Sequence, residues 1–536
     1  MSERESEPTE EEQRKTRHSA KGFIRGSSLF LVGRLISVVV NFLVGVLAVR
    51  YLAKIDFGAF TWAQAIAATG ASTVLLGLNR ATGRFAAIQH ERGEYRDMFG
   101  TITLALAAVG GLGLLVVTAV LGLRDLLEYH VYSDLSVGLL MIMIVLVPLD
   151  ALDALFETLM AVFAKVRAIF FRRYVLAPML KLGAVLLVMA FHGSVYMLAM
   201  AYVVAGIIGI ALYVILLRRV LAEQGLLKYF DPRRALPMRS LFGFSLPVMS
   251  TDVILGLETT MVVVLLEHFR SPVVVAELGA ALRVSVLCLL VFQNSKILYK
   301  PYASRLYARG DEASLRDLYW RSASWITIAT FPVFAACLFL AKPLVVFLFN
   351  DANTDYTAAA PLLAILAVGK FVNAALGMNT YTLQVHARVW LIFSVNVLTV
   401  VLGLGMCLVL IPRYGAIGGA IAGAATIITR NVMNQTALIA TTRVGIVPPA
   451  ALRLYGSVVA AVAVLGVVRL LTSSVFVLAP AVVIVSTMLP RINRRYLDIA
   501  ETFPELARIP LLGQFLGVQP RGAAALSSTS SGSGPS

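Results

Sequence analysis

Long apolar stretches separated by short polar segments run from Ser27 to Pro490. Most stretches are roughly 20 residues long, which is the length that an α-helix needs to cross the hydrocarbon core of a bilayer. The pattern predicts an all-α integral membrane protein with about fourteen transmembrane helices. We expect them at 27–49, 59–79, 98–123, 136–160, 172–191, 194–217, 241–266, 278–299, 320–341, 358–384, 389–411, 416–440, 450–472 and 475–490, the last being short for a full crossing.

The composition agrees with this pattern. Hydrophobic residues make up 59% of the 536 positions and charged residues only 14%, with a mean hydropathy of +0.82. A soluble domain carries about 25% charged residues. The formal net charge of +16 would suit a nucleic-acid-binding protein, but in a chain with many spans an excess of Lys and Arg marks the cytoplasmic loops. We therefore expect the lipid bilayer as a partner, and no nucleic acid.

Basic residues alternate from loop to loop. With a cytoplasmic N-terminus, the inner loops and tails hold 34 of the 46 Lys and Arg residues, and the outer loops hold 6. This bias predicts a multi-pass protein of the plasma membrane with both termini in the cytoplasm. It also favours an even number of crossings, because an odd number would place the basic run from Arg491 to Arg495 outside.

The two halves of the chain look alike. A Ser-Leu-Phe triplet opens a long span at Ser28 and again at Ser240, and each half then enters a basic, amphipathic inner loop. Both halves begin on the same side, which predicts a parallel repeat with a pseudo-twofold axis along the membrane normal. The expected organisation is a cytoplasmic tail at 1–26, six-helix bundles at 27–220 and 241–445 with a linker at 221–240, two additional helices at 446–490, and a cytoplasmic tail at 491–536 whose end is disordered.

Several segments carry a family resemblance. RYLAKIDFGAF (Arg50 to Phe60) follows the first span, and GLNRATGRFAA (Gly77 to Ala87) ends the second. Late in the chain, VGKFVNAALGMNTYTLQVHAR precedes LVLIPRYGAIGGAIAGA (Leu408 to Ala424), in which Pro412 and the glycines predict a tight outer turn. Over roughly residues 22–445 the chain resembles the polysaccharide-export flippases of the multidrug/oligosaccharidyl-lipid/polysaccharide superfamily, the group that contains O-antigen and lipid II flippases.

The resemblance implies a transporter and not an enzyme. The implied activity moves a lipid-linked (polyprenyl-diphosphate) oligosaccharide from the inner to the outer leaflet by alternating access, with glycosyltransferases or a polymerase of the same pathway as partners. Two alternatives stay open: an exporter of organic cations or drugs from the same superfamily, and a non-transporting scaffold of a glycan-assembly complex. The sequence contains no nucleotide-binding loop of the Walker type and no Ser/His/Asp set at one membrane face, which argues against catalysis.

Charged residues inside the predicted spans are candidates for function, because each is costly in lipid and must face a cavity or a partner. Arg34, Arg283, Lys370 and Arg430 lie on spans of the repeated core, and none has an acidic residue three or four positions away. The resemblance implies that spans one, two, seven and eight line a central cavity whose cations meet the lipid diphosphate. Arg34 and Arg283 fit this role most directly, since a guanidinium stays charged and binds phosphate through two hydrogen bonds.

Lys181 is a further substrate-binding candidate with two interpretations. Asp150, Asp153 and Glu157 form an acidic face on span four at spacing i, i+3, i+7. Lys181 lies at similar depth on the next span. It can neutralise one of these acids or bind a ligand.

Asp252 on span seven is the candidate coupling carboxylate. The resemblance implies that a gradient of Na⁺ or H⁺ drives transport, and that Asn396 on span eleven and Thr426 on span twelve supply further oxygen atoms to the ion. The alternative is that Asp252 pairs with Arg283 or Lys370. No cofactor beyond the coupling ion is expected.

Other residues at span depth carry weaker signals. Asn41 and Asn373 are substrate-binding candidates, since an amide there either bonds between helices or contacts the hydroxyl groups of a sugar. Cys288, Cys337 and Cys407 all fall inside spans and are expected to be small core residues. The chain has no CxxC motif and no Cys/His metal spacing, so we expect no metal site.

Overall fold

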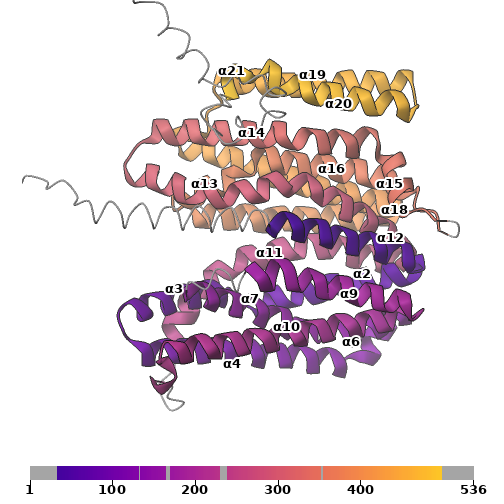
Figure 1. Ribbon diagram of the computed structural model, residues 1–536. Coiled ribbons are helices and arrows are strands. Elements are labelled where there is room, and N and C mark those ends of the chain that lie inside the picture. The colour runs from indigo at the N-terminus through magenta and orange to yellow at the C-terminus, as the bar shows by residue number, and fades with distance from the viewer. Residues whose placement is uncertain (1–32, 132, 164–169, 230–237, 352–353, 498–536) are drawn as a thin grey trace, which may run out of the picture. The chain divides into compact units, whose positions relative to one another are not determined.

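The computed structural model describes residues 33–131, 133–163, 170–229, 238–351 and 354–497 (Figure 1). Within these ranges the chain is helical apart from its loops and one isolated bridge between Asp351 and Thr354. The predicted all-α fold is therefore confirmed. The predicted tail at 1–26 and most of the predicted tail at 491–536 lie outside the described residues.

Twelve helices of the described chain are long and apolar enough to cross a membrane. One of them, Val389–Thr441, has 53 residues and contains Gly415 with φ 59° and ψ −132°, so it is two helices joined at a kink. α11 (Met238–Phe269) is a further helix of 32 residues. Each of the fourteen predicted spans coincides with one of these helices, including the short last one at α20 (Val475–Ile492). The protein is an integral, multi-pass membrane protein.

The described helices group into two compact units by their contacts. Unit 1 contains the described residues up to Arg283, the segment Asp351–Thr354 and the segment Met406–Gly419. Within it, α2 packs against α6, α7 and α11. Up to Arg283, the described elements of unit 1 are the helix Gly33–Tyr51, α2 (Lys54–Val74), α3 (Leu78–Glu91), α4 (Tyr95–Gly122), α5 (Arg124–His130), α6 (Asp134–Met143), α7 (Leu146–Val162), the π-helix η1 (Phe170–Leu176), α9 (Ala177–Ala190), α10 (Val195–Glu223), η2 (Leu226–Tyr229), α11 and most of α12 (Pro272–Ser285).

Unit 2 contains Val284–Asn350, Asp355–Gly405 and the described residues from Ala420 onward. Its elements are η3 (Val286–Leu289), α13 (Leu290–Ala308), α14 (Glu312–Phe339), α15 (Ala341–Phe349), α16 (Ala359–Leu376), α17 (Met378–Val385), α18 (Val389–Thr441) except its segment Met406–Gly419, η4 (Arg443–Gly445), α19 (Pro449–Leu471), α20 and α21 (Arg494–Leu497). The units are defined by contact alone, and they group α11 and most of α12 with the preceding helices. The bundle bounds at 27–220 and 241–445 stay a prediction.

Buried hydrogen bonds hold α14 in unit 2. The hydroxyl of Tyr319 donates to Gln435 Oε1 at 2.6 Å, and Trp320 Nε1 donates to the carbonyl of Val444 at 3.1 Å. Both aromatic side chains are at least 98% buried. A buried polar group costs free energy unless it has a partner, so these two bonds fix the rotation of α14 against α18 and η4.

Long helices are interrupted at two glycines whose φ is positive. Between α2 and α3, Gly77 has φ 67°, a left-handed conformation that glycine adopts without strain. In the IPRYGAIGG segment the chain turns at Gly415, whose φ is also positive. Arg270 donates to the carbonyl of Pro412 in this turn at 2.5 Å. A turn at this motif was predicted from Pro412 and the glycines, and it is confirmed.

Glycines allow α2 and α12 to approach closely in unit 1. A Cβ atom at Gly58 would meet the backbone carbonyl of Pro272. A Cβ atom at Gly279 would lie 3.1 Å from Thr61 Cγ2, tighter than ordinary van der Waals contact. The absence of a side chain at these two positions brings the backbone of α12 against α2.

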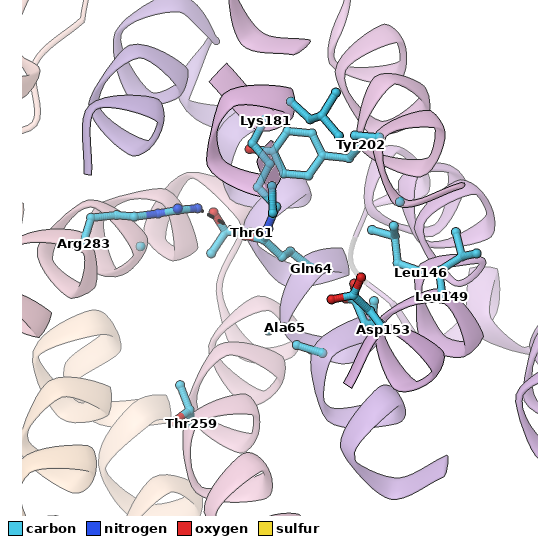
Figure 2. A pocket seen from close by; sticks show the side chains of 18 of the residues that line it. Thr61, Gln64, Ala65, Leu146, Leu149, Asp153, Lys181, Tyr202, Thr259 and Arg283 are labelled. Carbon is cyan, nitrogen blue, oxygen red and sulfur yellow. Dashed lines mark hydrogen bonds between the residues drawn. The ribbon is translucent and has the colours of Figure 1, made fainter. Parts of the chain in front are cut away.

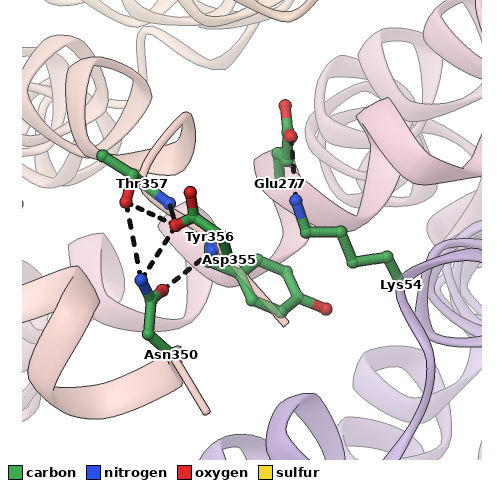
Figure 3. A network of polar contacts seen from close by, with 6 residues as sticks. All are labelled: Lys54, Glu277, Asn350, Asp355, Tyr356 and Thr357. Atoms are coloured by element: carbon green, nitrogen blue, oxygen red, sulfur yellow. Dashed lines mark hydrogen bonds and ion pairs between the residues drawn. The ribbon is translucent and has the colours of Figure 1, made fainter. Parts of the chain in front are cut away.

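In each unit, polar contacts join helices or order a loop (Figure 3). In unit 1, Lys54 Nζ at the start of α2 lies 3.3 Å from Glu277 Oε1 on α12, and both side chains are mostly buried. In unit 2, the Asn350 side chain accepts from the backbone N–H of Tyr356 at 2.8 Å and donates to Asp355 Oδ1 at 2.8 Å. The first contact joins two helices, and the second orders the loop before α16.

We expect Gly58→Ala to lower the free energy of unfolding by about 1–3 kcal/mol, because the added methyl group meets backbone that cannot rotate away. Gly110→Ala on α4 is the matched control, since nothing lies within 4 Å of a Cβ atom there. Thermal unfolding of both purified variants in detergent measures the difference. Equal midpoints for the two variants would show that α2 and α12 do not pack closely at Gly58.

Candidate functional site

A cavity of about 450 Å³ lies inside unit 1 (Figure 2). It is lined by residues of α2, α7, η1, α9, α10, α11 and α12, and most of its apolar lining is Ala and Leu. A charged group at membrane depth either pairs with another group of the protein or marks a transport pathway. The polar lining residues are Thr61, Gln64, Asp150, Asp153, Arg172, Lys181, Tyr202, Thr259 and Arg283.

Two arginines of η1 pair with the acidic face of α7. Arg172 forms an ion pair with Asp153, and Arg173 forms one with Glu157. η1 is π-helical, a wider turn that is often found at functional sites. Arg172 also donates through Nε to the carbonyl of Gly209 on α10 at 3.3 Å. The Arg172–Asp153 pair therefore joins α7, η1 and α10.

Arg172 and Arg173 were not among the candidates that the sequence suggested. They stand at the edge of the predicted fifth span, where basic residues usually mark the membrane interface. The sequence nevertheless contained a signal for these two ion pairs. Two adjacent arginines begin the span that follows an i, i+3, i+7 acidic face, and antiparallel neighbouring helices bring such positions to the same level.

Lys181 lines the cavity from α9, and its Nζ lies 5.9 Å from the centre of the Tyr202 ring. It was predicted either to neutralise an acid of span four or to bind a ligand. The direct ion-pair partner of Asp153 is Arg172. Lys181 and Asp150 attract each other electrostatically without a hydrogen bond between them in the described chain. The ammonium group of Lys181 thus faces the cavity.

Arg283 reaches the cavity from α12 and extends towards α2 (Figure 2). Its Nη2 donates to the neutral amide oxygen of Gln64 at 3.2 Å, and its guanidinium carbon lies 5.9 Å from the centre of the Phe57 ring. A Cβ atom at Gly45, on helix Gly33–Tyr51, would lie 3.0 Å from Arg283 Cδ. A guanidinium has five N–H donors. Within the described residues no carboxylate contacts the guanidinium of Arg283, which lines the cavity.

Two candidates on helix Gly33–Tyr51 lie elsewhere. Arg34 is half-buried close to η1, because the neighbouring Gly33 packs against Phe170. Asn41 is exposed and donates to the carbonyl of Ser37 on its own helix at 2.7 Å. Neither residue lines the cavity of unit 1.

The other candidates belong to unit 2, except one. Lys370 and Arg430 are half-buried on α16 and α18. The side chain of Asn373 accepts from Asn431 Nδ2 at 3.0 Å, which ties α16 to α18. The exception, Asp252, lies on α11, and its side chain is outside the described residues.

Two proposed ion ligands, Asn396 and Thr426, are buried on α18. Thr426 Oγ1 donates to the carbonyl of Ala422 at 2.8 Å. The carbonyl of Asn396 accepts from Thr399 Oγ1 at 3.0 Å. Both contacts stay within one helix, so they stabilise α18 locally.

The model of the polysaccharide biosynthesis protein family matches residues 23–295 of this chain. This match covers about half of the sequence, and it includes every residue that lines the cavity. The protein belongs to the polysaccharide biosynthesis protein family. No curated protein matches the sequence.

Solved structures show which fold this family member adopts. It is similar to the lipid II flippase MurJ in an inward closed conformation, with a TM-score of 0.67 and 13% identity over 90% of this chain and 100% of that one. It is also similar to an inward-facing multidrug resistance MATE family transporter of the MOP superfamily, with a TM-score of 0.64 and 13% identity over 77% and 98%. The family member therefore has the fold of MOP-superfamily transporters.

A third similar structure is a MOP superfamily transporter from Pyrococcus furiosus, with a TM-score of 0.53 and 13% identity over 78% of this chain and 96% of that one. The reverse polarity of the binding pocket of that transporter suggests a different function for it.

We expect Asp153→Asn to lower the free energy of unfolding by roughly 3–5 kcal/mol, because it leaves a buried guanidinium without its counter-charge. The side chain of Arg172 is only 6% exposed. Glu128→Gln is the control: it pairs with Arg124 on α5, outside the candidate spans, where both side chains are exposed and a pair contributes about 0–1 kcal/mol. Thermal unfolding in detergent compares the two, and an equal loss for both would contradict this assignment.

Proposed function

We propose that this protein flips a lipid-linked oligosaccharide, carried on polyprenyl diphosphate, from the inner to the outer leaflet of the plasma membrane. Both termini lie in the cytoplasm, and transport proceeds by alternating access. The observation that carries the proposal is the guanidinium of Arg283, which faces a cavity of about 450 Å³ and has a neutral amide as its partner. Membership of the polysaccharide biosynthesis family supports a glycan as the cargo.

The chemistry of the headgroup fits these side chains. A guanidinium presents planar, paired N–H donors that match two phosphate oxygens, whereas an ammonium group acts as a point charge. Arg283 therefore contributes geometry, and Lys181 contributes a mobile positive charge in the same cavity. The headgroup enters the polar cavity while the lipid tail stays in the bilayer. Glycosyltransferases or a polymerase of the same pathway supply or consume the cargo.

An organic-cation exporter is the second candidate function. One observation favours it: Asp150 and Tyr202 line the same cavity, and a carboxylate beside an aromatic ring is a suitable environment for a cation. Arg172, Lys181 and Arg283 also line that cavity and repel a cationic cargo. The balance of charge therefore favours the anionic diphosphate.

Transport is coupled to a gradient of Na⁺ or H⁺, and Asp252 on α11 is the proposed coupling carboxylate. The support is an acidic residue in the middle of a 32-residue helix, where an unmatched charge is costly.

We expect Arg283→Ala to reduce headgroup affinity on the order of 10- to 100-fold, and export with it, because a charge-assisted hydrogen bond is lost. Arg283→Lys should restore export only partly, since lysine loses the paired donors. Export into proteoliposomes and the yield of folded protein are measured side by side. Arg270→Ala is the control, because Arg270 bonds to Pro412 outside the cavity lining. Parental export by folded Arg283→Ala would refute this role and direct attention to Lys370 and Arg430.

For coupling, we expect Asp252→Asn to slow gradient-driven export while headgroup binding stays near the parental value. Export is measured across a range of sodium concentrations and pH values. Equal rates for variant and parent throughout that range would eliminate Asp252 as the coupling residue. Loss of folded protein would instead indicate a buried ion pair with Arg283, whose disruption costs about 3–5 kcal/mol.

A further inference from the structure

The charges that line the cavity do not balance. Within the described chain the lining contains two acids, Asp150 and Asp153, and three bases, Arg172, Lys181 and Arg283, so its formal charge is one positive unit. A diphosphate diester brings two negative charges. The loaded cavity would then carry one excess negative charge at membrane depth, where an unmatched charge is costly.

Asp150 is the group that can remove this excess negative charge by taking up a proton. Asp153 is held by Arg172, whereas Asp150 has no hydrogen bond or ion pair among the described residues. Its carboxylate faces the cavity from α7. The neighbouring Lys181 on α9 and Arg172 on η1 attract it, and Asp153 on its own helix repels it.

The remaining elements around the cavity contribute few titratable groups. Tyr202 lines it from α10 and Arg283 from α12. The described lining residues of α2 and α11 are uncharged, and their polar members are Thr61, Gln64 and Thr259. Lys181 and Arg172 are therefore the described positive groups that attract the carboxylate of Asp150, and a bound diphosphate competes with it for Lys181.

A diphosphate in this cavity acts on Asp150 in two ways. It occupies the ammonium group of Lys181, and its own negative charges repel a nearby carboxylate. Both effects favour the protonated, neutral form of the carboxyl group. We propose that Asp150 takes up one proton when the diphosphate headgroup binds, so that headgroup binding and protonation are linked. This inference rests on the proposed function.

The charges then balance. The proton bonds to a carboxylate oxygen of Asp150, whose charge changes from minus one to zero, and the loaded cavity becomes formally neutral. A sodium ion is a poorer candidate for this position, because Lys181 repels it. A cycle that carries a diphosphate and a proton outward moves one net negative charge outward, which an inside-negative membrane potential favours.

The test uses the full-length protein in detergent with farnesyl-diphospho-N-acetylglucosamine, a diphosphate diester whose own charge stays constant near neutral pH. Calorimetry in two buffers of different ionisation enthalpy counts the protons taken up. We expect the parent to take up about one proton per bound probe. Its Kd should rise with pH, by at most about tenfold per pH unit, over the range where the free protein has lost this proton and the complex keeps it. Asp150→Asn should abolish the uptake, give a flat Kd and bind more tightly than the parent at the alkaline end. Glu157→Gln, on the same helix but outside the lining, should behave like the parent.

The outcomes separate this inference from the proposed function. If the parent binds the probe and Arg283→Ala does not, but no proton is taken up, the headgroup site stands and the linkage is wrong. The linkage is also wrong if Asp150→Asn keeps the pH slope, or if sodium replaces the proton in the parent. A parent that does not bind the probe refutes the headgroup site itself. The proton count in the parent decides the matter even if Asp150→Asn fails to fold.

Discussion

A charge that leaves water for the interior of a membrane protein must be matched, and this requirement organises unit 1. Asp153 and Glu157 on α7 are matched by adjacent arginines of η1, which ties α7 to the beginning of α9. Asp150, one turn earlier, and Lys181 line the cavity without touching each other. Unit 1 thus contains two classes of charge: those that hold helices together and those that are directed at a cavity.

Close packing of helices determines where the second class lies. The absence of side chains at Gly58 and Gly279 lets α12 approach α2, and Gly45 leaves room for the stem of Arg283. The guanidinium therefore reaches Gln64 on α2. Small residues are the usual means by which membrane helices come together, since lipid provides little hydrophobic driving force between them. Here the glycines also determine where the guanidinium of Arg283 lies.

The mixed signs of the cavity are central to its chemistry. A purely cationic cavity would bind a diphosphate tightly and release it slowly, whereas a carboxylate beside the cations opposes the bound anion. In the proposed linkage, a single proton on Asp150 removes that opposition.

The sequence alone determined the spans, the turn at Gly415 and the acidic face of α7, because lipid imposes length and polarity on each helix separately and periodicity within a helix is local. It also singled out Arg283 and Lys181 as intramembrane cations. Only the tertiary structure decided which charges are matched. Asp153 has Arg172 as its partner, and Arg283 meets Gln64, 219 positions away, while Asn41 bonds within its own helix. These contacts depend on how each helix is rotated and shifted against its neighbours, and that arrangement results from close packing between distant segments, which no local pattern encodes.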